Sequence, residues 1–213
     1  MDEAIPRRSF RREGEERRRE ALIAATLDLV SEGGPQAATV RAIAERAGVT
    51  PGLIRHYFLT KDDLVGAAYQ ALMDRLTGDS VAVLAACPDD PCARLAAFVV
   101  ASLRPPVVDA RALGLWAGFL HQVRERPDML GIHESAYLAF RDQLQALIGA
   151  VLPGTDGARL RVLAIACNAV MDGLWLEASA LPTAFGRDEA ARIGLASVAA
   201  ILDVTLDFPQ ETA

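Results

Sequence analysis

Apolar residues recur along this chain at intervals of three and four, and this periodicity constrains the fold more than any other feature. Residues with this spacing lie on one face of an α-helix, where they can be buried together. No run of β-branched residues bounded by hairpin turns interrupts the pattern. We therefore predict an all-α protein. With 213 residues, of which 52% are apolar, the chain can bury a substantial core.

Prolines, glycines and capping residues divide the pattern into about nine helices. We expect them near residues 16–31, 40–47, 51–58, 61–77, 92–103, 108–125, 128–151, 156–180 and 188–206. Thr39, Thr50 and Thr60 are predicted to cap three of these helices, and Thr60 forms a capping box with Asp63. Gly48 ends the second helix, at a position that favours a left-handed backbone.

The net charge of −6 conceals an uneven distribution of charge. Residues 1–61 contain 11 Lys and Arg against 9 Asp and Glu, a net of +2, whereas the remaining residues contain 11 against 19, a net of −8. Seven of the arginines lie close together, at Arg7, Arg8, Arg11, Arg12, Arg17, Arg18 and Arg19. A basic end on an acidic body is expected when a small part of a protein meets phosphate and the rest is kept away from it.

Several classes of protein are excluded by the sequence. The longest stretch without a charged residue runs from Gln143 to Thr155, which is too short to span a membrane. The Arg-rich N-terminus lacks the apolar run of a secretory signal, so we expect a cytoplasmic protein. The three cysteines, Cys87, Cys92 and Cys167, match no disulfide or metal-binding pattern and are interpreted as small buried apolar residues. We expect neither a metal ion nor a cofactor.

Residues 39–58 have the layout of a helix-turn-helix, in which two short helices cross at roughly 90–120°. Ala44 supplies the small residue that the crossing needs, and Gly48 supplies the turn. The predicted core beneath the turn consists of Ile43, Ala47, Val49 and Ile54. An ordinary helical hairpin within a bundle is the alternative interpretation.

The second helix of this motif is short and begins with small residues, so its N-terminal end can enter the major groove of DNA. Its exposed face is predicted to carry Thr50, Gly52, Arg55 and His56. Arginine can read guanine through two hydrogen bonds, and histidine and threonine can reach base edges or phosphates. This pattern favours DNA binding.

The segment from Thr39 to Lys61, with the amphipathic helix before it, resembles the DNA-binding domain of TetR-family transcriptional regulators. The most specific part is the run His56-Tyr57-Phe58, followed by Lys61, an acidic pair and Leu64. The resemblance implies that Tyr57 and Lys61 contact DNA phosphates, and Lys61 is the only lysine of the chain. The complete predicted DNA-binding set is Thr39, Arg41, Thr50, Pro51, Gly52, Arg55, His56, Tyr57 and Lys61.

Arg55 departs from many members of that family, which have an aromatic residue at this position, so their base preference is not transferred. The run Arg55-His56-Tyr57 is closer to the BetI-like subgroup of choline-responsive repressors, which residues 116–119 and 171–176 resemble more weakly. The resemblance implies a ligand-responsive regulator, more often a repressor than an activator. A small-molecule effector bound among the C-terminal helices would release such a repressor from its operator.

The candidate effector-binding residues are Trp116, Phe119, Asp172 and Trp175. Aromatic rings around one carboxylate suit a quaternary ammonium or a similar cation, because the ring faces attract positive charge. The alternative is that the tryptophans belong to the core and that Asp172 faces solvent. A buried carboxylate, in contrast, needs a partner or a ligand.

The helices predicted near 156–180 and 188–206 carry wide apolar stripes, which can serve both a core and a partner subunit. We expect a homodimer, because the family dimerises through these helices. A dimer places its two recognition helices about 34–36 Å apart, or somewhat more, to match successive major grooves.

The predicted organisation is a flexible Arg-rich arm (1–17), a helix-turn-helix DNA-binding domain (18–64) and an effector-binding and dimerisation domain (65–213). The rival hypotheses are a small helical enzyme and a helical protein-interaction module. The sequence lacks the phosphate-loop, Glu-x-x-His and Gly-x-Ser-x-Gly patterns of several enzyme classes, so we expect a protein that is not an enzyme. An interaction module would not need a short helix with a basic tip of small residues.

Overall fold

A computed structural model describes the backbone of residues 7–209 and the side chains from residue 14 onwards. Within this range it contains nine α-helices, one 3-10 turn and no strand, which confirms the predicted all-α fold. The helices are α1 (Arg7–Gly33), α2 (Val40–Arg46), α3 (Pro51–Tyr57), α4 (Lys61–Ala82), α5 (Pro91–Ser102), α6 (Ala110–Glu125), α7 (Pro127–Val151), α8 (Gly157–Ala180) and α9 (Glu189–Leu202), with the 3-10 turn η1 at Val83–Ala85.

Most helix ends lie where capping chemistry predicts them. The Thr39 side chain accepts a hydrogen bond from the Ala42 N–H, and Thr60 and Asp63 form the predicted capping box. Gly48 has a φ of +65°, the left-handed backbone expected of it. Thr50 occupies the N-cap position of α3, but its side chain makes no capping hydrogen bond, so that part of the prediction is wrong. Pro51 at the start of α3 needs no N–H partner and fixes the first turn without this bond.

Three helix boundaries differ from the predicted ones. Helix α1 begins at Arg7 rather than near Glu16, so residues 7–17 continue the helix instead of forming a separate arm, while residues 1–6 lie outside the described residues. Arginine and glutamate are strong helix formers, which explains the longer helix. Helix α4 continues to Ala82, since no proline stops it before Pro88. Helix α9 ends at Leu202, where Asp203 adopts a left-handed backbone.

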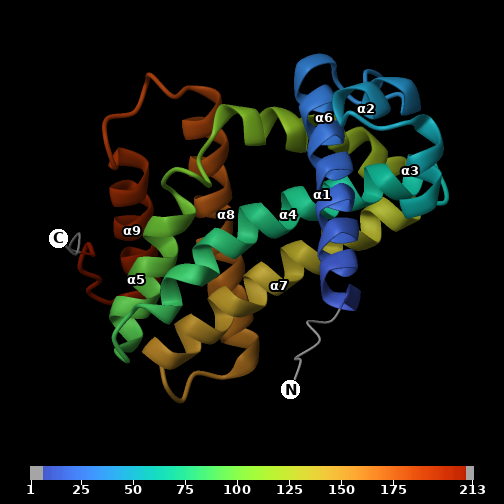
Figure 1. Cartoon of the computed structure of the whole chain (residues 1–213). Coiled ribbons are helices and arrows are strands. Elements are labelled where there is room, and N and C mark those ends of the chain that lie inside the picture. The colour runs from blue at the N-terminus through green and yellow to red at the C-terminus, as the bar shows by residue number, and fades with distance from the viewer. Residues whose placement is uncertain (1–6, 210–213) are drawn as a thin grey trace, which may run out of the picture.

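Two hydrophobic cores are stacked along the molecule. One core joins α1, α2, α3 and the first half of α4 to Leu115, Phe119 and Met129 of α6 and α7. The other joins α5, the second half of α7, α8 and α9. Figure 1 shows α1, α2 and α3 grouped at one end and α5 and α9 at the other, with α4 and α7 running between them. Helix α4 crosses the predicted domain boundary between residues 64 and 65, and its buried face continues across that boundary from Leu64 to Met73.

Helix α8 is long and apolar enough by composition to cross a membrane, with a mean hydropathy of 1.3. It packs instead against α7 and α9, and its side chains Asn168 and Asp172 make polar contacts with α7. Only 39% of its most apolar window is buried within the chain. An apolar face of this helix is therefore left uncovered.

We predict that Gly48→Ala destabilises the fold by about 1 kcal/mol, because an L-residue pays this penalty for a left-handed backbone. No atom lies within 4 Å of a Cβ added at Gly48, so the effect comes from the backbone alone. Gly78→Ala is the matched control. A Cβ added there also meets nothing, but Gly78 lies inside α4, where alanine should stabilise by about 0.5–1 kcal/mol. Denaturant titration followed by circular dichroism measures the free energy of unfolding of both variants. A change of the same sign in both would contradict the left-handed backbone of Gly48.

Candidate DNA-binding surface and ligand cavity

The predicted DNA-binding residues lie on the start of α2, on α3 and on the first turn of α4, at the end of the molecule where Figure 1 places α2 and α3. Most of these side chains are exposed, at Thr39, Arg41, Thr50, Pro51, Gly52, Arg55 and His56. Tyr57 and Lys61 are half-buried. The structure thus brings basic and small polar residues together without covering them with the rest of the chain.

The packing beneath this surface fixes α3 against α2. The N–H of Val49 donates to the carbonyl oxygen of Ala44 at 2.9 Å, which closes the turn between the helices. Ile43, Ala44 and Ile54 are buried at the crossing, as predicted, while Ala47 and Val49 are half-buried around it. Because these residues are packed, the exposed face of α3 is held at a defined angle.

The connection from α3 to α4 is short and anchored at both ends. Phe58 is buried, and the Arg19 guanidinium of α1 lies over its ring at 5.2 Å from the ring centre. The capping box of Thr60 and Asp63 holds the start of α4. Leu59, which lies between these anchors, is 91% exposed and adds an apolar side chain that was not predicted for this surface. Lys61 follows directly and forms no ion pair with any described residue.

A cavity of about 420 Å³ lies in the C-terminal part of the chain, between α4, α6, α7 and α8. Trp116, Asp172 and Trp175 line it, so the structure brings together three of the four predicted effector-binding residues. The two indole rings meet edge to face, with their centres 5.7 Å apart, and the Trp175 N–H donates to the carbonyl oxygen of Val107 at 2.9 Å. Both tryptophans are therefore held in place.

Phe119 is not part of this cavity. It is fully buried in the core that α1, α2, α3 and the first half of α4 share with α6 and α7. There its ring packs on Tyr69, with the ring centres 5.2 Å apart. Phe119 lies three residues after Trp116 on α6, so it is on nearly the same face but one turn further along the helix. At that level the face meets the core that contains Tyr69 and Met129 instead of the cavity. The predicted placement of Phe119 beside the other three residues is therefore wrong.

Asp172 lies in a polar cluster that opens into the cavity. Its Oδ2 accepts hydrogen bonds from the Tyr137 hydroxyl and from Nδ2 of Asn168, at 2.8 Å for the latter. Burial raises the pKa of Asp172, and the two hydrogen bonds oppose this effect. No described arginine forms an ion pair with Asp172. The carboxylate is thus partly buried, hydrogen-bonded and without a counter-ion among the residues that the structure describes.

Tyr137 and His133 extend the cluster along α7. Their rings stack with centres 5.8 Å apart, and Nδ1 of His133 lies 2.7 Å from the Tyr69 hydroxyl of α4. Burial lowers the pKa of His133 and raises the pKa of Tyr69 to about 12. Neither Tyr137 nor His133 was predicted to belong to the site. Their spacing of four residues on one helix is also that of ordinary core residues, so no local signal distinguished them.

No group of histidine, cysteine and acidic side chains that could hold a metal ion occurs among the described residues. Cys167 is buried, and burial raises the pKa of its thiol to about 11, which suits the predicted role of a small apolar residue. Cys87 and Cys92 are half-buried rather than buried. None of the three cysteines lines the cavity.

Comparison with known proteins identifies the family. The family described as "Bacterial regulatory proteins, tetR family" matches residues 22–68, and "BetI-type transcriptional repressor, C-terminal" matches residues 91–203. A protein named HTH-type transcriptional regulator BetI from Serratia proteamaculans is 34% identical over 81% of this chain and 86% of its own length. This chain belongs to the TetR family. It is a transcriptional regulator with a BetI-type C-terminal domain, and its relatives are regulators rather than enzymes.

Solved structures agree with this assignment. A transcriptional regulator from Pseudomonas aeruginosa PAO1 matches this TetR-family chain with a TM-score of 0.80 and 31% identity, covering 88% of this chain and 91% of that one. A regulator from Saccharomonospora viridis, solved in complex with choline, matches with a TM-score of 0.68 and 18% identity, covering 83% and 92% of the two chains. At this identity the second structure supports the fold alone.

Asp172 should make the stability of this TetR-family protein depend on pH. Since burial raises its pKa above the ordinary 3.8, the folded state binds the proton more tightly than the unfolded state. The contribution of Asp172 to the stability of the folded state therefore becomes less favourable as the pH rises from the pKa of Asp172 in the unfolded state through its pKa in the folded state. We predict that Asp172→Asn raises the melting temperature, relative to the wild type, more at about pH 7.5 than at about pH 4.

Asp142→Asn is the matched control, because Asp142 lies on the exposed side of α7 and takes part in none of the contacts of the cluster. Differential scanning calorimetry of the three proteins at both pH values measures the effect. A shift for Asp172→Asn that is the same at both pH values would contradict the burial of an ionised carboxylate at this site.

Proposed function

We propose that this regulator is a dimeric repressor that binds operator DNA through α3 and the first turn of α4, and that leaves the operator when a small organic cation fills the cavity. The observation that carries the effector class is Asp172, a partly buried carboxylate that has no counter-ion among the described residues and lies beside two tryptophan rings. Such a regulator acts in the cytoplasm, where it meets the chromosome.

The DNA-binding roles divide between phosphate and base contacts. Lys61 carries a compact charge at the start of α4 and is assigned to one phosphate, with Tyr57 beside it. Arg55 and His56 lie on the exposed face of α3 and are assigned to base edges in the major groove. Arg41 and Thr39, at the start of α2, are assigned to the flanking backbone.

The effector is proposed to be a quaternary ammonium compound of the size of choline. A cation over the indole faces gains cation–π attraction, and its charge compensates the carboxylate of Asp172. The cavity volume of about 420 Å³ exceeds what so small a molecule needs, so water or a longer substituent shares the space. The regulator from Saccharomonospora viridis, a protein of the same fold, was solved in complex with choline, so this fold can accommodate a ligand of this class.

The uncovered face of α8 supports a homodimer. Exposed apolar and small residues follow one stripe of α8, at Val162, Ile165, Ala169, Gly173, Leu176 and Ala180, and a shorter stripe of α9, at Ile193, Ala196 and Ala200. Val162 is 55% exposed and Leu176 is 47% exposed, which is unusual for large apolar side chains in a helix of the core. Two copies that pair through these stripes would bury both of them.

The proposed division of the chain places DNA binding in residues 18–64 and effector binding and dimerisation in residues 65–213. Helix α4 belongs to both parts, since its first turn lies on the DNA-binding surface and Met73, Leu76 and Thr77 line the cavity. An effector that changes the position of α4 would change the DNA-binding surface directly. By linkage, the effector weakens operator affinity by the same factor by which the operator weakens effector affinity.

We predict that Lys61→Ala and Arg55→Ala weaken DNA binding in different ways. Loss of one phosphate contact should lower the affinity for all duplexes alike and reduce the slope of log K against log salt by about 0.9. Loss of a base contact should instead reduce discrimination at one position by about 1–3 kcal/mol. Fluorescence anisotropy with a selected duplex and its single-base variants, at several salt concentrations, measures both effects.

Arg46→Ala is the control for a general loss of positive charge on α2, because Arg46 is paired with Glu32 at 2.7 Å. Equal loss of base discrimination in the Lys61 and Arg55 variants would contradict the proposed division between phosphate and base contacts.

The proposed effector class predicts that choline raises the melting temperature of the wild type. The uncharged isostere 3,3-dimethylbutan-1-ol should have a much smaller effect, because it fills the same volume without the charge. Trp116→Leu should weaken choline binding by about 2-fold to 30-fold, the equivalent of about 0.5–2 kcal/mol for one cation–π contact. Isothermal titration calorimetry measures the affinities. Tighter binding of the uncharged isostere than of choline would overturn the cationic class and leave the family assignment intact.

A further inference from the structure

The corner between α6 and α7 consists of a single residue, Arg126. Its N–H donates to the carbonyl oxygen of Gln122 in α6, and its own carbonyl oxygen accepts from the Leu130 N–H in α7, both at 2.9 Å. Pro127 then fixes the first position of α7. The backbone of Arg126 is therefore bound into both helices.

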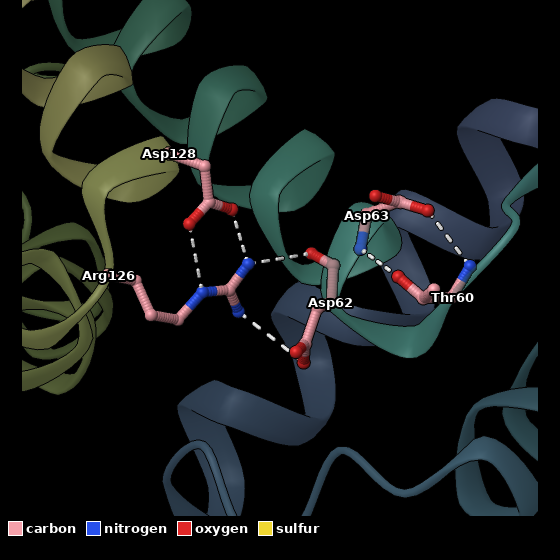
Figure 2. Close-up of polar contacts among 5 residues, drawn as sticks. All are labelled: Thr60, Asp62, Asp63, Arg126 and Asp128. Atoms are coloured by element: carbon pink, nitrogen blue, oxygen red, sulfur yellow. Dashed lines mark hydrogen bonds and ion pairs between the residues drawn. The ribbon is translucent and has the colours of Figure 1, made fainter.

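The side chain of Arg126 is held by α7 and reaches across to α4. Nε of Arg126 donates to Oδ1 of Asp128 at 3.2 Å, and one terminal NH₂ group donates to Oδ2 of the same carboxylate, a two-point contact. That same NH₂ group donates to the carbonyl oxygen of Asp62 at 3.3 Å, and the other lies 3.4 Å from Oδ1 of Asp62. Figure 2 shows the guanidinium between the two aspartates.

The residue that Arg126 contacts lies next to the proposed phosphate contact. Asp62 follows Lys61 directly in the sequence. Asp63, the next residue, closes the capping box with Thr60, as Figure 2 shows. The first turn of α4 is thus bound from two directions, by its own cap and by Arg126. The cap fixes the turn locally, whereas Arg126 adds a directional contact with α7 to the apolar packing that the two helices share.

The helix that begins at this corner continues to the cavity. His133, Tyr137 and Phe140 of α7 line the cavity, and the first of them lies seven residues after Arg126, about two helical turns. A short, hydrogen-bonded helix segment is stiff over this length. Any displacement of α7 at the cavity therefore moves the Arg126 corner.

Arg126 differs from an ordinary surface ion pair in how its side chain is fixed. It is 22% exposed, and the Arg126 guanidinium lowers the pKa of Asp128 by hydrogen bonding. An exposed ion pair loses much of its free energy in ordering two long side chains. Because Asp128 already orders the guanidinium, the contact with Asp62 needs little further ordering.

We propose that Arg126 is the positioning residue that fixes the first turn of α4, and with it Lys61 and α3, relative to α7 and the ligand cavity. In a dimer held together by α8 and α9, this contact sets the separation of the two recognition helices. The consequence for DNA rests on the proposed DNA-binding surface, whereas the positioning itself does not.

The first experiment measures position without DNA. Spin labels are attached to cysteines introduced at Glu45 in α2 and Ala139 in α7, both exposed, after Cys87 and Cys92 are replaced by serine. Dilution with unlabelled protein restricts the measured distances to one chain. We expect Arg126→Met and Asp62→Asn to broaden or shift the distance distribution, and Arg126→Lys to restore part of the wild-type distribution.

Arg124→Gln is the matched control, because Arg124 is an exposed arginine two residues away that lies outside the contacts of the corner. Its distance distribution should equal that of the wild type. Circular dichroism confirms that each variant is folded. If Arg126→Met disrupts folding, Asp62→Asn tests the ion pair by itself, since it removes the charge of the Asp62 side chain and leaves its carbonyl oxygen in place. A distribution in the folded variants that equals the wild-type distribution overturns the proposal.

The second experiment measures the consequence for DNA. A duplex selected from random sequence by the wild type is lengthened or shortened by one base pair between its half-sites. The wild type should bind the altered duplex more weakly than the selected one. For Arg126→Met this fold-loss of affinity should be about twofold to fivefold smaller, the range that an exposed ion pair supplies. A purely structural defect would weaken binding equally to duplexes of every half-site spacing. Failure of the wild type to bind DNA would instead overturn the proposed function, and the distance measurement would still decide the role of Arg126.

Discussion

The structure depends on α4 being packed in two cores at once. Leu64, Val65 and Tyr69 belong to the core beneath the DNA-binding surface, and further along the same helix Met73, Leu76 and Thr77 form part of the cavity wall. An α-helix is a stiff rod over this length, held by a hydrogen bond at almost every residue. The helix therefore cannot move at the cavity while its first turn stays in place, unless other contacts bend it. This constraint connects the proposed ligand cavity with the distant surface of α2 and α3.

The cavity illustrates how a site of mixed polarity is kept inside an apolar body. Asp172 is supported by Tyr137 and Asn168, so the carboxylate is hydrogen-bonded although no arginine in the described part of the chain neutralises it. A fully apolar cavity would make the fold more stable but would have nothing to distinguish a cation from a neutral molecule of the same shape. In the proposed function, the charge of Asp172 therefore favours selectivity for a cation and lowers the stability of the fold.

Two kinds of contact connect the DNA-binding part to the rest of the chain. The packed core that α1 and α4 share with α6 and α7 resists separation, and its apolar contacts tolerate small rotations. The ion pair of Arg126 with Asp62 is directional and defines one orientation within that range. Apolar packing therefore holds the parts together, and the charged contact determines how they face each other.

Much of this protein could be predicted from its sequence because the signals are local. Helix periodicity, the Thr60–Asp63 capping box and the left-handed Gly48 depend only on neighbouring residues, and all of them occur where the sequence predicts them. The resemblance of residues 39–61 to TetR-family regulators gave the function, since this motif is compact and its functional residues are contiguous. The early start of α1 at Arg7 was missed because a charged segment without apolar periodicity also suits an extended arm.

Only the tertiary structure decided which distant residues meet. Trp116, Tyr137 and Asp172 come from three helices and line one cavity, while Phe119, three residues from Trp116, is buried elsewhere. Arg126 contacts Asp62 across 64 positions of sequence. Spacing along one helix gives the face on which a residue lies, but the neighbour of that face depends on how all the helices pack. The sequence by itself therefore determined the helices and the DNA-binding motif, and the packing of α4, α6, α7 and α8 decided the cavity and its connection to that motif.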